Sequence, residues 1–271
     1  MNFLIIFYLL GVFFAVYQDF TRREIDDWLN LFLFSTGVLF LGFTQQLFTN
    51  PTVLVTFGSF VFIVSLLSFA FYYGRFFSGG DSKLFFALSP LFFTPLLSFS
   101  CYNLFFYTIL LFVCGSVYSL VYSSYLFFRD FKKVKVVFLS ELNKKYYIFL
   151  IYLAVIFLFL GFFEKLIFIF SIFIFAFVFL ICMAKSLEEI SMKRLVSTKN
   201  LREGDWLFFD VEVGKKMFRK NWEGLNAKDL KYLKKFNKKI YVKDGIPYAP
   251  SFLFALFLFV FRDYLLGIIF S

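Results

Sequence analysis

The chain has 271 residues, of which 61% are hydrophobic and 25% are aromatic, and its mean hydropathy is +0.80. This composition is well above the apolar content of soluble globular domains and predicts a membrane protein. The formal net charge is +10 and no His is present, which excludes Ser-His-Asp and Cys-His catalysis and the H-E-x-x-H zinc peptidases. Carboxylate chemistry, Ser-Lys chemistry or no catalysis at all remain.

The spacing of the three cysteines also does not indicate a metal-binding site. Cys101, Cys114 and Cys182 lie in or beside apolar runs and lack C-x-x-C spacing. We therefore expect no structural zinc and no cofactor. Residues 1–8 contain no Lys or Arg, so we expect the first apolar run to be retained as a spanning helix and not removed as a secretory signal.

Apolar runs long enough for a membrane-spanning helix, about 20 residues, recur along the chain. They predict an all-α polytopic membrane protein with about eight transmembrane helices. The predicted spans are Asn2–Gln18, Leu29–Gln45, Thr52–Tyr73, Leu84–Leu97, Asn103–Phe128, Tyr147–Phe163, Leu166–Met183 and Tyr248–Phe261. Glu164–Lys165 is the expected hairpin point of the long run 147–183, and Leu265–Phe270 is expected to lie along the membrane.

The positive charges predict the topology of these spans. Of the 28 Lys and Arg residues, 26 lie in four alternate connections, 18–28, 74–83, 129–145 and 185–243. By the positive-inside rule these connections face the cytoplasm and both termini lie outside.

The stretch 185–246 is the only soluble region large enough to fold, and it reads as a small α/β cytoplasmic module. Trp206–Val213 and Lys239–Val242 are predicted strands. Between them Asn226 can cap a helix that presents Leu230 and Leu233 on one face. The net positive charge of the module fits contact with anionic membrane lipids, and a solvated basic surface is an equal alternative.

Two acidic residues occupy comparable places at the cytoplasmic ends of apolar helices. Asp19 ends the first span, and Asp81 precedes the fourth. Each alone reads as an interfacial carboxylate paired with a nearby Arg or Lys. Together, two carboxyls in a low-dielectric site share one proton, which is what aspartyl proteolysis requires: the ionised member activates water and the protonated member polarises the scissile carbonyl.

Gly79 and Gly80 directly precede Asp81. Glycine permits positive φ and close approach of another chain, so we expect these two residues to admit a substrate peptide. The alternative is that they simply interrupt the helix.

The two acidic motifs resemble those of the type IV prepilin peptidases, and more closely their archaeal preflagellin (archaellin) peptidase relatives. These intramembrane aspartyl proteases have a first motif of Asp followed by Arg-x-Ile, here Asp19, Arg23 and Ile25, and a second motif G-x-G-D-x-K, here Gly80-Asp81-Ser82-Lys83. The resemblance implies that Asp19 and Asp81 are the catalytic pair. The stretches Glu203–Leu207 and Gly245–Pro247 look like the C-terminal region of some archaeal members.

The chain departs from the family pattern at several points. Ser78 replaces the first Gly of the second motif, and Asp26–Asp27 stand where many bacterial members have Pro-Asn. The Cys-rich N-terminal segment linked to N-methylation in bifunctional bacterial members is not found, so methyltransferase activity is not expected.

Charged residues around the two motifs are candidate supporting groups. Glu24, Asp26 and Asp27 are expected to receive the basic leader that family substrates carry, or else to offset neighbouring arginines in a solvated loop. Arg23 and Lys83 either favour the ionised carboxylate or anchor the chain at lipid phosphates.

These observations predict a multi-pass cell-membrane aspartyl endopeptidase that removes short basic leaders from prepilin-like or preflagellin-like precursors at the cytoplasmic face. The predicted domains are a transmembrane helical catalytic domain (1–184), the cytoplasmic α/β module (185–246) and a C-terminal transmembrane helix (247–271). No nucleic-acid partner is expected. Two alternatives remain: a polytopic transporter or scaffold using Asp19 and Asp81 as ion-coupling or structural groups, and a presenilin-like intramembrane protease.

Overall fold

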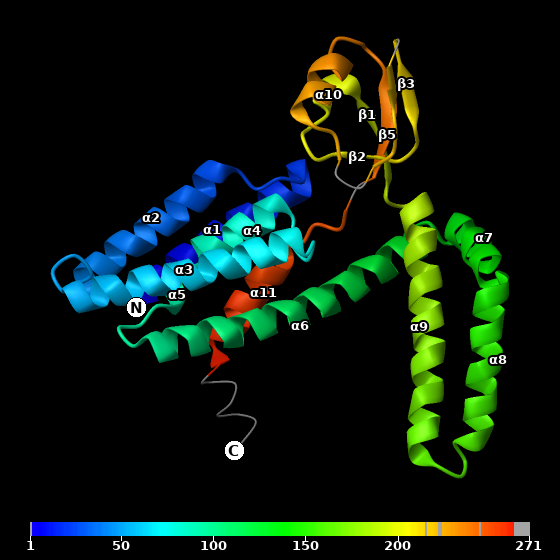
Figure 1. Ribbon diagram of the computed structural model, residues 1–271, viewed down its shortest axis with the longest axis horizontal. Coiled ribbons are helices and arrows are strands. Elements are labelled where there is room, and N and C mark those ends of the chain that lie inside the picture. Colours follow the sequence, from blue (N-terminus) through cyan, green and yellow to red (C-terminus); the bar gives the residue numbers. More distant parts are fainter. Residues whose placement is uncertain (1, 215, 222–223, 244, 263–271) are drawn as a thin grey trace. The chain divides into compact units, whose positions relative to one another are not determined.

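Helices make up most of the chain, and a small sheet region lies toward the C-terminus (Figure 1). The computed structural model describes residues 2–214, 216–221, 224–243 and 245–262. The chain divides into two units: Met1–Leu120 together with Pro247–Ser271, and Val121–Ile246. The C-terminal stretch therefore belongs to the same unit as the first 120 residues.

The first unit is a helical bundle. Its helices are α1 (Asn2–Arg22), α2 (Asp27–Thr44), α3 (Pro51–Tyr73), α4 (Gly79–Ala87), α5 (Ser89–Phe92), the first part of α6 (Leu97–Arg129) and α11 (Ala249–Val260). The short helix α4 packs against both α2 and α3, and α1 packs against both α2 and α11. Helices α1 and α11 are thus neighbours in space, although they lie far apart in the sequence.

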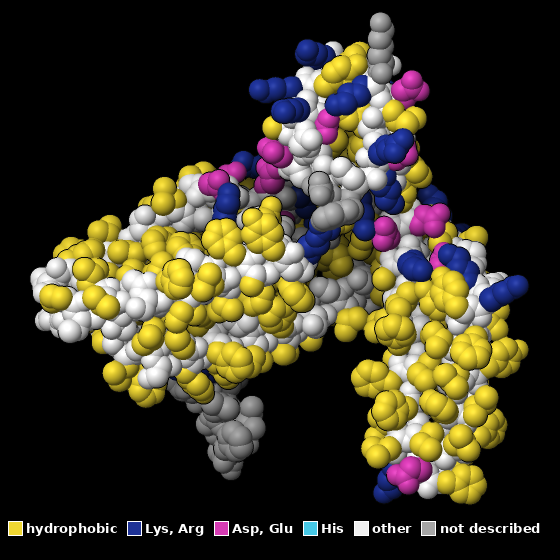
Figure 2. Space-filling view, viewed as in Figure 1, with side chains coloured by type: hydrophobic (Ala, Val, Ile, Leu, Met, Phe, Trp, Pro, Cys, Tyr) yellow, Lys and Arg dark blue, Asp and Glu magenta, His cyan; other side chains and the backbone are white. Residues whose placement is uncertain are grey.

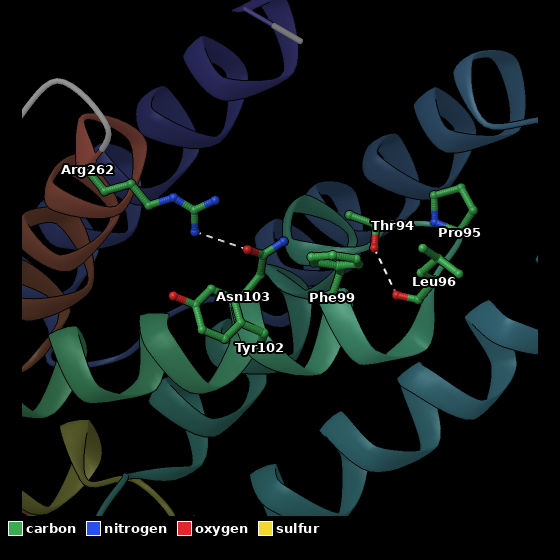
Figure 3. Close-up of a pocket in the computed structure, with 7 residues that line it drawn as sticks. All are labelled: Thr94, Pro95, Leu96, Phe99, Tyr102, Asn103 and Arg262. Atoms are coloured by element: carbon green, nitrogen blue, oxygen red, sulfur yellow. Dashed lines mark hydrogen bonds between the residues drawn. The ribbon is translucent and has the colours of Figure 1, made fainter. Parts of the chain in front are cut away.

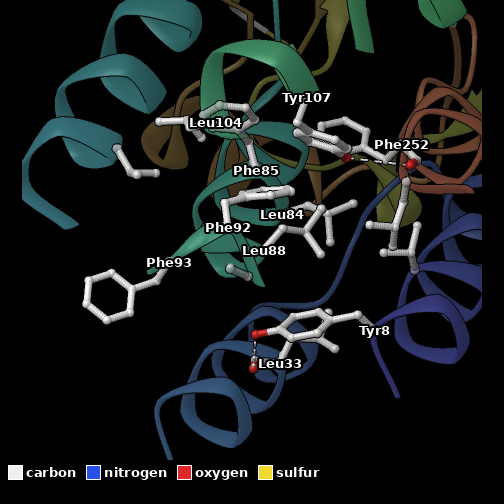
Figure 4. Close-up of a cluster of buried hydrophobic side chains, with 14 of the residues drawn as sticks. Tyr8, Leu33, Leu84, Phe85, Leu88, Phe92, Phe93, Leu104, Tyr107 and Phe252 are labelled. Carbon is white, nitrogen blue, oxygen red and sulfur yellow. Dashed lines mark hydrogen bonds between the residues drawn. The ribbon is translucent and has the colours of Figure 1, made fainter. Parts of the chain in front are cut away.

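A buried cluster of apolar and aromatic side chains holds this bundle together (Figure 4). Two of its tyrosines are fully buried, and each hydroxyl donates to a backbone carbonyl: Tyr8 to Leu33 at 3.1 Å and Tyr107 to Phe252 at 3.5 Å. A buried hydroxyl without such a partner would be destabilising. These bonds connect α1 to α2 and α6 to α11.

Five helices in the described part of the chain are long and apolar enough to cross a membrane: α1, α2, α3, α6 and α9 (Lys165–Ile190). The helices α7 (Phe131–Leu142) and α8 (Lys145–Leu160) meet at 78° and form a sixth candidate if they are counted as one broken span. The predicted number of eight spans is therefore not confirmed.

Two of the predicted spans are shorter than expected. In place of the span Leu84–Leu97, α4 ends at Ala87 and α5 covers only four residues. Pro90 and Pro95 lack backbone N–H groups and interrupt a continuous helix. The last predicted span corresponds to α11, which has 12 residues, fewer than the roughly 20 needed to cross the hydrocarbon core.

The second unit contains a helical hairpin. The predicted turn at Glu164–Lys165 is confirmed, since α8 ends before it and Glu164 is the N-cap of α9. The Ser171 hydroxyl joins the two helices by donating to the Ala154 carbonyl at 2.8 Å. Helix α7 was not predicted, because its Lys-rich sequence reads as a charged loop.

The second unit also contains the predicted α/β module. Its elements are β1 (Lys193–Ser197), a short 3-10 helix η1 (Thr198–Asn200), β2 (Trp206–Leu207), β3 (Val211–Val213), β4 (Lys216–Phe218), α10 (Ala227–Leu233) and β5 (Lys239–Lys243). Strands β1, β5 and β2 form an antiparallel sheet in that order, and β3 pairs with β4.

The predictions for this module are confirmed in part. Strand β5 and the α10 helix are present, and the Asn226 side chain accepts the Asp229 N–H at 2.8 Å. Leu230 and Leu233 are buried in the small core of the module. The predicted single strand Trp206–Val213 is wrong, because β2 pairs with β5 whereas β3 pairs with β4, and the chain must bend between two partners.

The surfaces of the helices and of the module differ in chemistry (Figure 2). Hydrophobic side chains cover the outer faces of the long helices, with Phe3, Phe43 and Phe173 each more than 70% exposed. Lys and Arg gather over the strands and α10. Such apolar outer faces are those expected of helices that contact lipid. The predicted surface segment Leu265–Phe270 lies outside the described residues.

Candidate active site

Asp19 lies in the last turn of α1, where an otherwise apolar helix approaches its polar end. Its side chain is buried, with 8% exposure. Its Oδ2 atom accepts a 2.9 Å hydrogen bond from the backbone N–H of Ala249, the first residue of α11. The contact joins two residues separated by 230 positions in the sequence.

Asp81 lies in the first turn of α4 and is held by the residue that begins this helix. Ser78 is the N-cap: its hydroxyl donates to Asp81 Oδ2 at 2.7 Å, and its backbone N–H donates to the same oxygen at 3.2 Å. The Asp81 N–H in turn donates to Ser78 Oγ at 3.3 Å. This reciprocal arrangement is a capping box, and it fixes the carboxyl while leaving it 7% exposed.

The fold brings the two carboxyls within electrostatic reach of each other. Burial raises the pKa of Asp81 from 3.8 to about 6, with a smaller contribution from the negative charge of Asp19, while the hydrogen bonds from Ser78 oppose the rise. A carboxyl that loses its water shell disfavours its charged form, and a nearby like charge adds to that effect. The charge of Asp19 therefore affects the ionisation of Asp81, as is required of two carboxyls that share a proton.

The two glycines before Asp81 do not adopt the positive φ that their freedom would allow. Both lie in the first helical turn of α4, because the Ser78 cap starts the helix directly before them. A Cβ on Gly80 would lie 3.4 Å from Ile25, and a Cβ on Gly79 would meet only Tyr72, at 3.7 Å. The expectation of positive φ is wrong, but the missing side chain of Gly80 lets this end of α4 lie close to Ile25 in the α1–α2 connection.

Positive φ occurs instead at Arg23, with φ of 60°, in the connection between α1 and α2. Its backbone N–H donates to the Asp19 carbonyl at 3.0 Å. The left-handed conformation costs a non-glycine residue roughly 1–2 kcal/mol, and it turns the chain sharply beside Asp19. Arg23 thus contributes to the shape of the site through its backbone.

The acidic residues of the first connection are engaged within the protein. Asp26 Oδ2 accepts hydrogen bonds from Gln18 Nε2 at 2.9 Å and from Trp28 Nε1 at 3.1 Å. Asp27 Oδ1 pairs with Lys83 Nζ at 2.6 Å, which links the two predicted catalytic connections. Glu24 is exposed.

Two contributors were not identified from the sequence. Ser78 was noted only as a departure from a motif, although Ser-x-x-Asp before a helix is itself a capping signal. Ala249 acts through its backbone N–H, and no side-chain pattern marks such a donor.

The structure also contains a cavity that does not include the carboxyl pair (Figure 3). It measures about 520 Å³ and is lined by residues of the α5–α6 connection, the start of α6 and Arg262. Arg262 donates to Asn103 Oδ1 at 3.0 Å. Within the described residues, no three Asp, Glu or Cys side chains gather in a way that could hold a metal ion.

Replacing Ser78 by Ala is expected to lower the free energy of unfolding by about 1 kcal/mol, because α4 loses its N-cap acceptor. It should also raise the pKa of Asp81, since the Ser78 hydroxyl hydrogen bond lowers it. Thermal unfolding in detergent measures the first effect, and the pH–rate profile the second. Ser78→Thr keeps a hydroxyl and is the matched control; equal behaviour of the two variants would contradict the role of the hydroxyl.

Comparison with known proteins supports the assignment of the first unit. Residues 6–124 match the model of the type IV leader peptidase family. Comparisons with curated proteins and with solved structures found no match. The matched segment includes Asp19, Gly79, Gly80 and Asp81, whereas Ala249 lies beyond it. Over residues 6–124, a little under half of its length, the chain is therefore similar to the type IV leader peptidase family.

Proposed function

We propose that this protein is an aspartyl endopeptidase that removes a short basic leader from prepilin-like or preflagellin-like precursors at the cytoplasmic face of the membrane. The similarity of residues 6–124 to the type IV leader peptidase family supports a peptidase that acts on precursor proteins. The five helices of the described residues that are long and apolar enough to cross a membrane support a multi-pass membrane protein. The observation that carries the aspartyl assignment is the pair of buried, electrostatically interacting carboxyls of Asp19 and Asp81.

The proposed chemistry uses one ionised and one protonated carboxyl. The ionised member takes a proton from water as the water oxygen attacks the scissile carbonyl, and the protonated member donates a hydrogen bond to that carbonyl oxygen. When the C–N bond breaks, the proton passes to the leaving amine. The products are the leader, with a new carboxyl group, and the mature chain, with a new amino group.

Cleavage of a precursor at its leader junction is the direct test. Membranes containing the wild-type protein should shorten a prepilin-like or preflagellin-like precursor, and sequencing the N-terminus of the product should locate the cut after the basic leader. The Asp19→Ala variant should insert into membranes normally and give no product. Equal cleavage by this variant would refute the aspartyl assignment, and a cut elsewhere would refute the substrate assignment.

The acidic residues Glu24, Asp26 and Asp27 are proposed to receive the Lys or Arg residues of the leader. Glu24 and Asp26 lie in the connection between α1 and α2, and Asp27 is the first residue of α2. Opposite charges attract strongly near a membrane, where screening by water is reduced. Reversing the charges at Asp26 and Asp27 should raise KM for a basic-leader precursor by about tenfold or more, the effect of losing about 1.4 kcal/mol of binding.

A precursor with a neutral leader controls for loss of structure, because Asp26 also binds Gln18 and Asp27 also pairs with Lys83. Cleavage of the neutral-leader precursor should change little. An unchanged KM for the basic-leader precursor would show that these residues do not bind the leader.

A further inference from the structure

We propose that the N-terminus of α11 is a positioning element of the active site, in which the Ala249 N–H stabilises Asp19 as the ionised carboxylate and leaves the shared proton on Asp81. The proposal rests on the proposed aspartyl function and adds to it an assignment of the two roles. Asp19 is then the base that activates water, and Asp81 is the acid that hydrogen-bonds the scissile carbonyl.

The contact between Asp19 and α11 is buried on both sides. Ala249 is fully buried and Asp19 is 8% exposed, and the N–H to Oδ2 distance is 2.9 Å. A hydrogen bond from a backbone N–H to a carboxylate favours the charged form, and so does the positive end of a helix dipole. Helix α11 has 12 residues, long enough to contribute such a dipole.

The first turn of α11 directs this one donor to Asp19. Pro250 has no N–H to offer, and the Ser251 N–H already donates to the Tyr248 carbonyl at 2.9 Å. The Ala249 N–H would therefore be an orphan donor of the helix terminus without Asp19. The carboxylate satisfies it, so each group stabilises the other.

The preceding residue fixes where α11 begins. The Tyr248 hydroxyl donates to the Leu111 carbonyl of α6 at 3.4 Å, and its ring packs 5.7 Å from that of Phe77. A side chain at Gly115 would overlap the Tyr248 ring and hydroxyl. Tyr248 thus anchors the start of α11 against α6 and the connection that leads to Asp81.

Asp81 has a different environment, which accounts for the asymmetry. Its hydrogen bonds with Ser78 also favour the charged form, but burial outweighs them and raises the pKa of Asp81 to about 6. When two interacting carboxyls share one proton, the proton resides on the member with the less favourable environment for charge. The proposal assigns this role to Asp81, because its two hydrogen bonds from Ser78 do not offset its burial, whereas Asp19 accepts its hydrogen bond from the positive end of α11.

The test removes the N–H and leaves the side chain in place. Cell-free translation with an acylated suppressor tRNA replaces Ala249 by lactic acid in the full-length protein, which exchanges the N–H for an ester oxygen. We expect kcat for a leader-bearing precursor to fall about ten- to hundredfold, the effect of losing a hydrogen bond to a charged group. KM should stay within about twofold, because the lost contact lies inside the enzyme.

Ala255 provides a matched control, because it is another fully buried alanine of the same helix. The same lactic acid replacement there removes an ordinary helical hydrogen bond and should leave kcat within about twofold. An unchanged kcat for the ester at position 249, or equal losses at both positions, would overturn the proposal.

A double-mutant cycle tests the contact without catalysis. The ester at position 249 should lower Tm in the wild-type protein by more than it does in the Asp19→Ala protein. Equal lowering in both backgrounds would overturn the proposal, even if no precursor is cleaved.

If the wild-type protein cleaves no precursor while the cycle shows coupling, the proposed function fails and the contact stands. If the ester protein does not fold, Ala249→Pro, which also removes the N–H, takes its place in the double-mutant cycle. The strain that Pro imposes on the αR backbone of Tyr248 is then common to both backgrounds.

Discussion

The Asp81→Asn variant is expected to lose precursor cleavage by at least about a thousandfold and, at the same time, to gain stability above pH 6. The loss follows because the variant has no acidic proton to share with Asp19, and enzymes lose several orders of magnitude when a catalytic group is removed. The gain follows because Asn has no charge to bury.

The size of the stability gain comes from the pKa of Asp81, which burial raises from 3.8 to about 6. Between these two values the folded state binds more protons than the unfolded state, so the stability contributed by this group is present below pH 3.8 and is lost as pH rises through 6. The difference is about 3 kcal/mol. The Asn variant does not undergo this loss, so its advantage over the wild type should grow by about that amount from pH 3 to pH 7.

Thermal or denaturant unfolding in detergent at several pH values measures this difference, and the precursor assay measures activity. Asp210→Asn is a suitable control, since Asp210 is exposed in the α/β module and its substitution should change neither quantity. A stability difference that is independent of pH would show that Asp81 is not buried as a titrating group. Substantial activity in Asp81→Asn would exclude Asp81 as a catalytic residue.

The second large effect is expected in the pH dependence of cleavage. If Asp81 must be protonated, kcat/KM should fall above pH 6 by about tenfold for each pH unit, reaching about one hundredth of its plateau at pH 8. The sign follows from the acid role: raising the pH removes the proton that polarises the scissile carbonyl. Because the two carboxyls interact, the pKa obtained from this decline in kcat/KM is a property of the pair and not of Asp81 alone.

Initial rates at low substrate concentration between pH 5 and 8.5 measure this fall in kcat/KM. The Ser78→Ala variant should move it to higher pH, because the lost hydrogen bond had lowered the pKa of Asp81, and Ser78→Thr should leave it in place. A rate that rises through this range would reverse the assignment of acid and base.

The environment of the carboxyl pair explains why each of these effects is large. Water screens charges and reduces the pKa shifts of exposed carboxyls, but Asp19 and Asp81 are each less than a tenth exposed. Backbone donors from helix ends, Ala249 for Asp19 and Ser78 for Asp81, replace the missing water. The fold therefore supplies each of the two buried carboxyls with its own backbone donor.

The sequence alone was sufficient to predict those features that depend on composition and on short-range spacing of residues. Long apolar runs predict membrane helices because each needs only its own residues to satisfy its backbone, and α1, α2, α3, α6 and α9 confirm five of them. The α8–α9 turn, the Asn226 cap and β5 are likewise local signals. The two Asp motifs could be recognised in the sequence because each extends over only a few consecutive residues.

The tertiary structure alone decided how these pieces combine. The fourth predicted span became α4 and α5, because its prolines break the backbone hydrogen bonding that an apolar run would otherwise support. The Trp206–Val213 segment divided into two strands, because its halves pair with different partners. Ala249 donates a hydrogen bond to Asp19 because α1 packs against α11, across 230 residues of sequence. A backbone N–H leaves no mark in the sequence. Burial and long-range contact, which set the different environments of Asp19 and Asp81, exist only once the chain has folded.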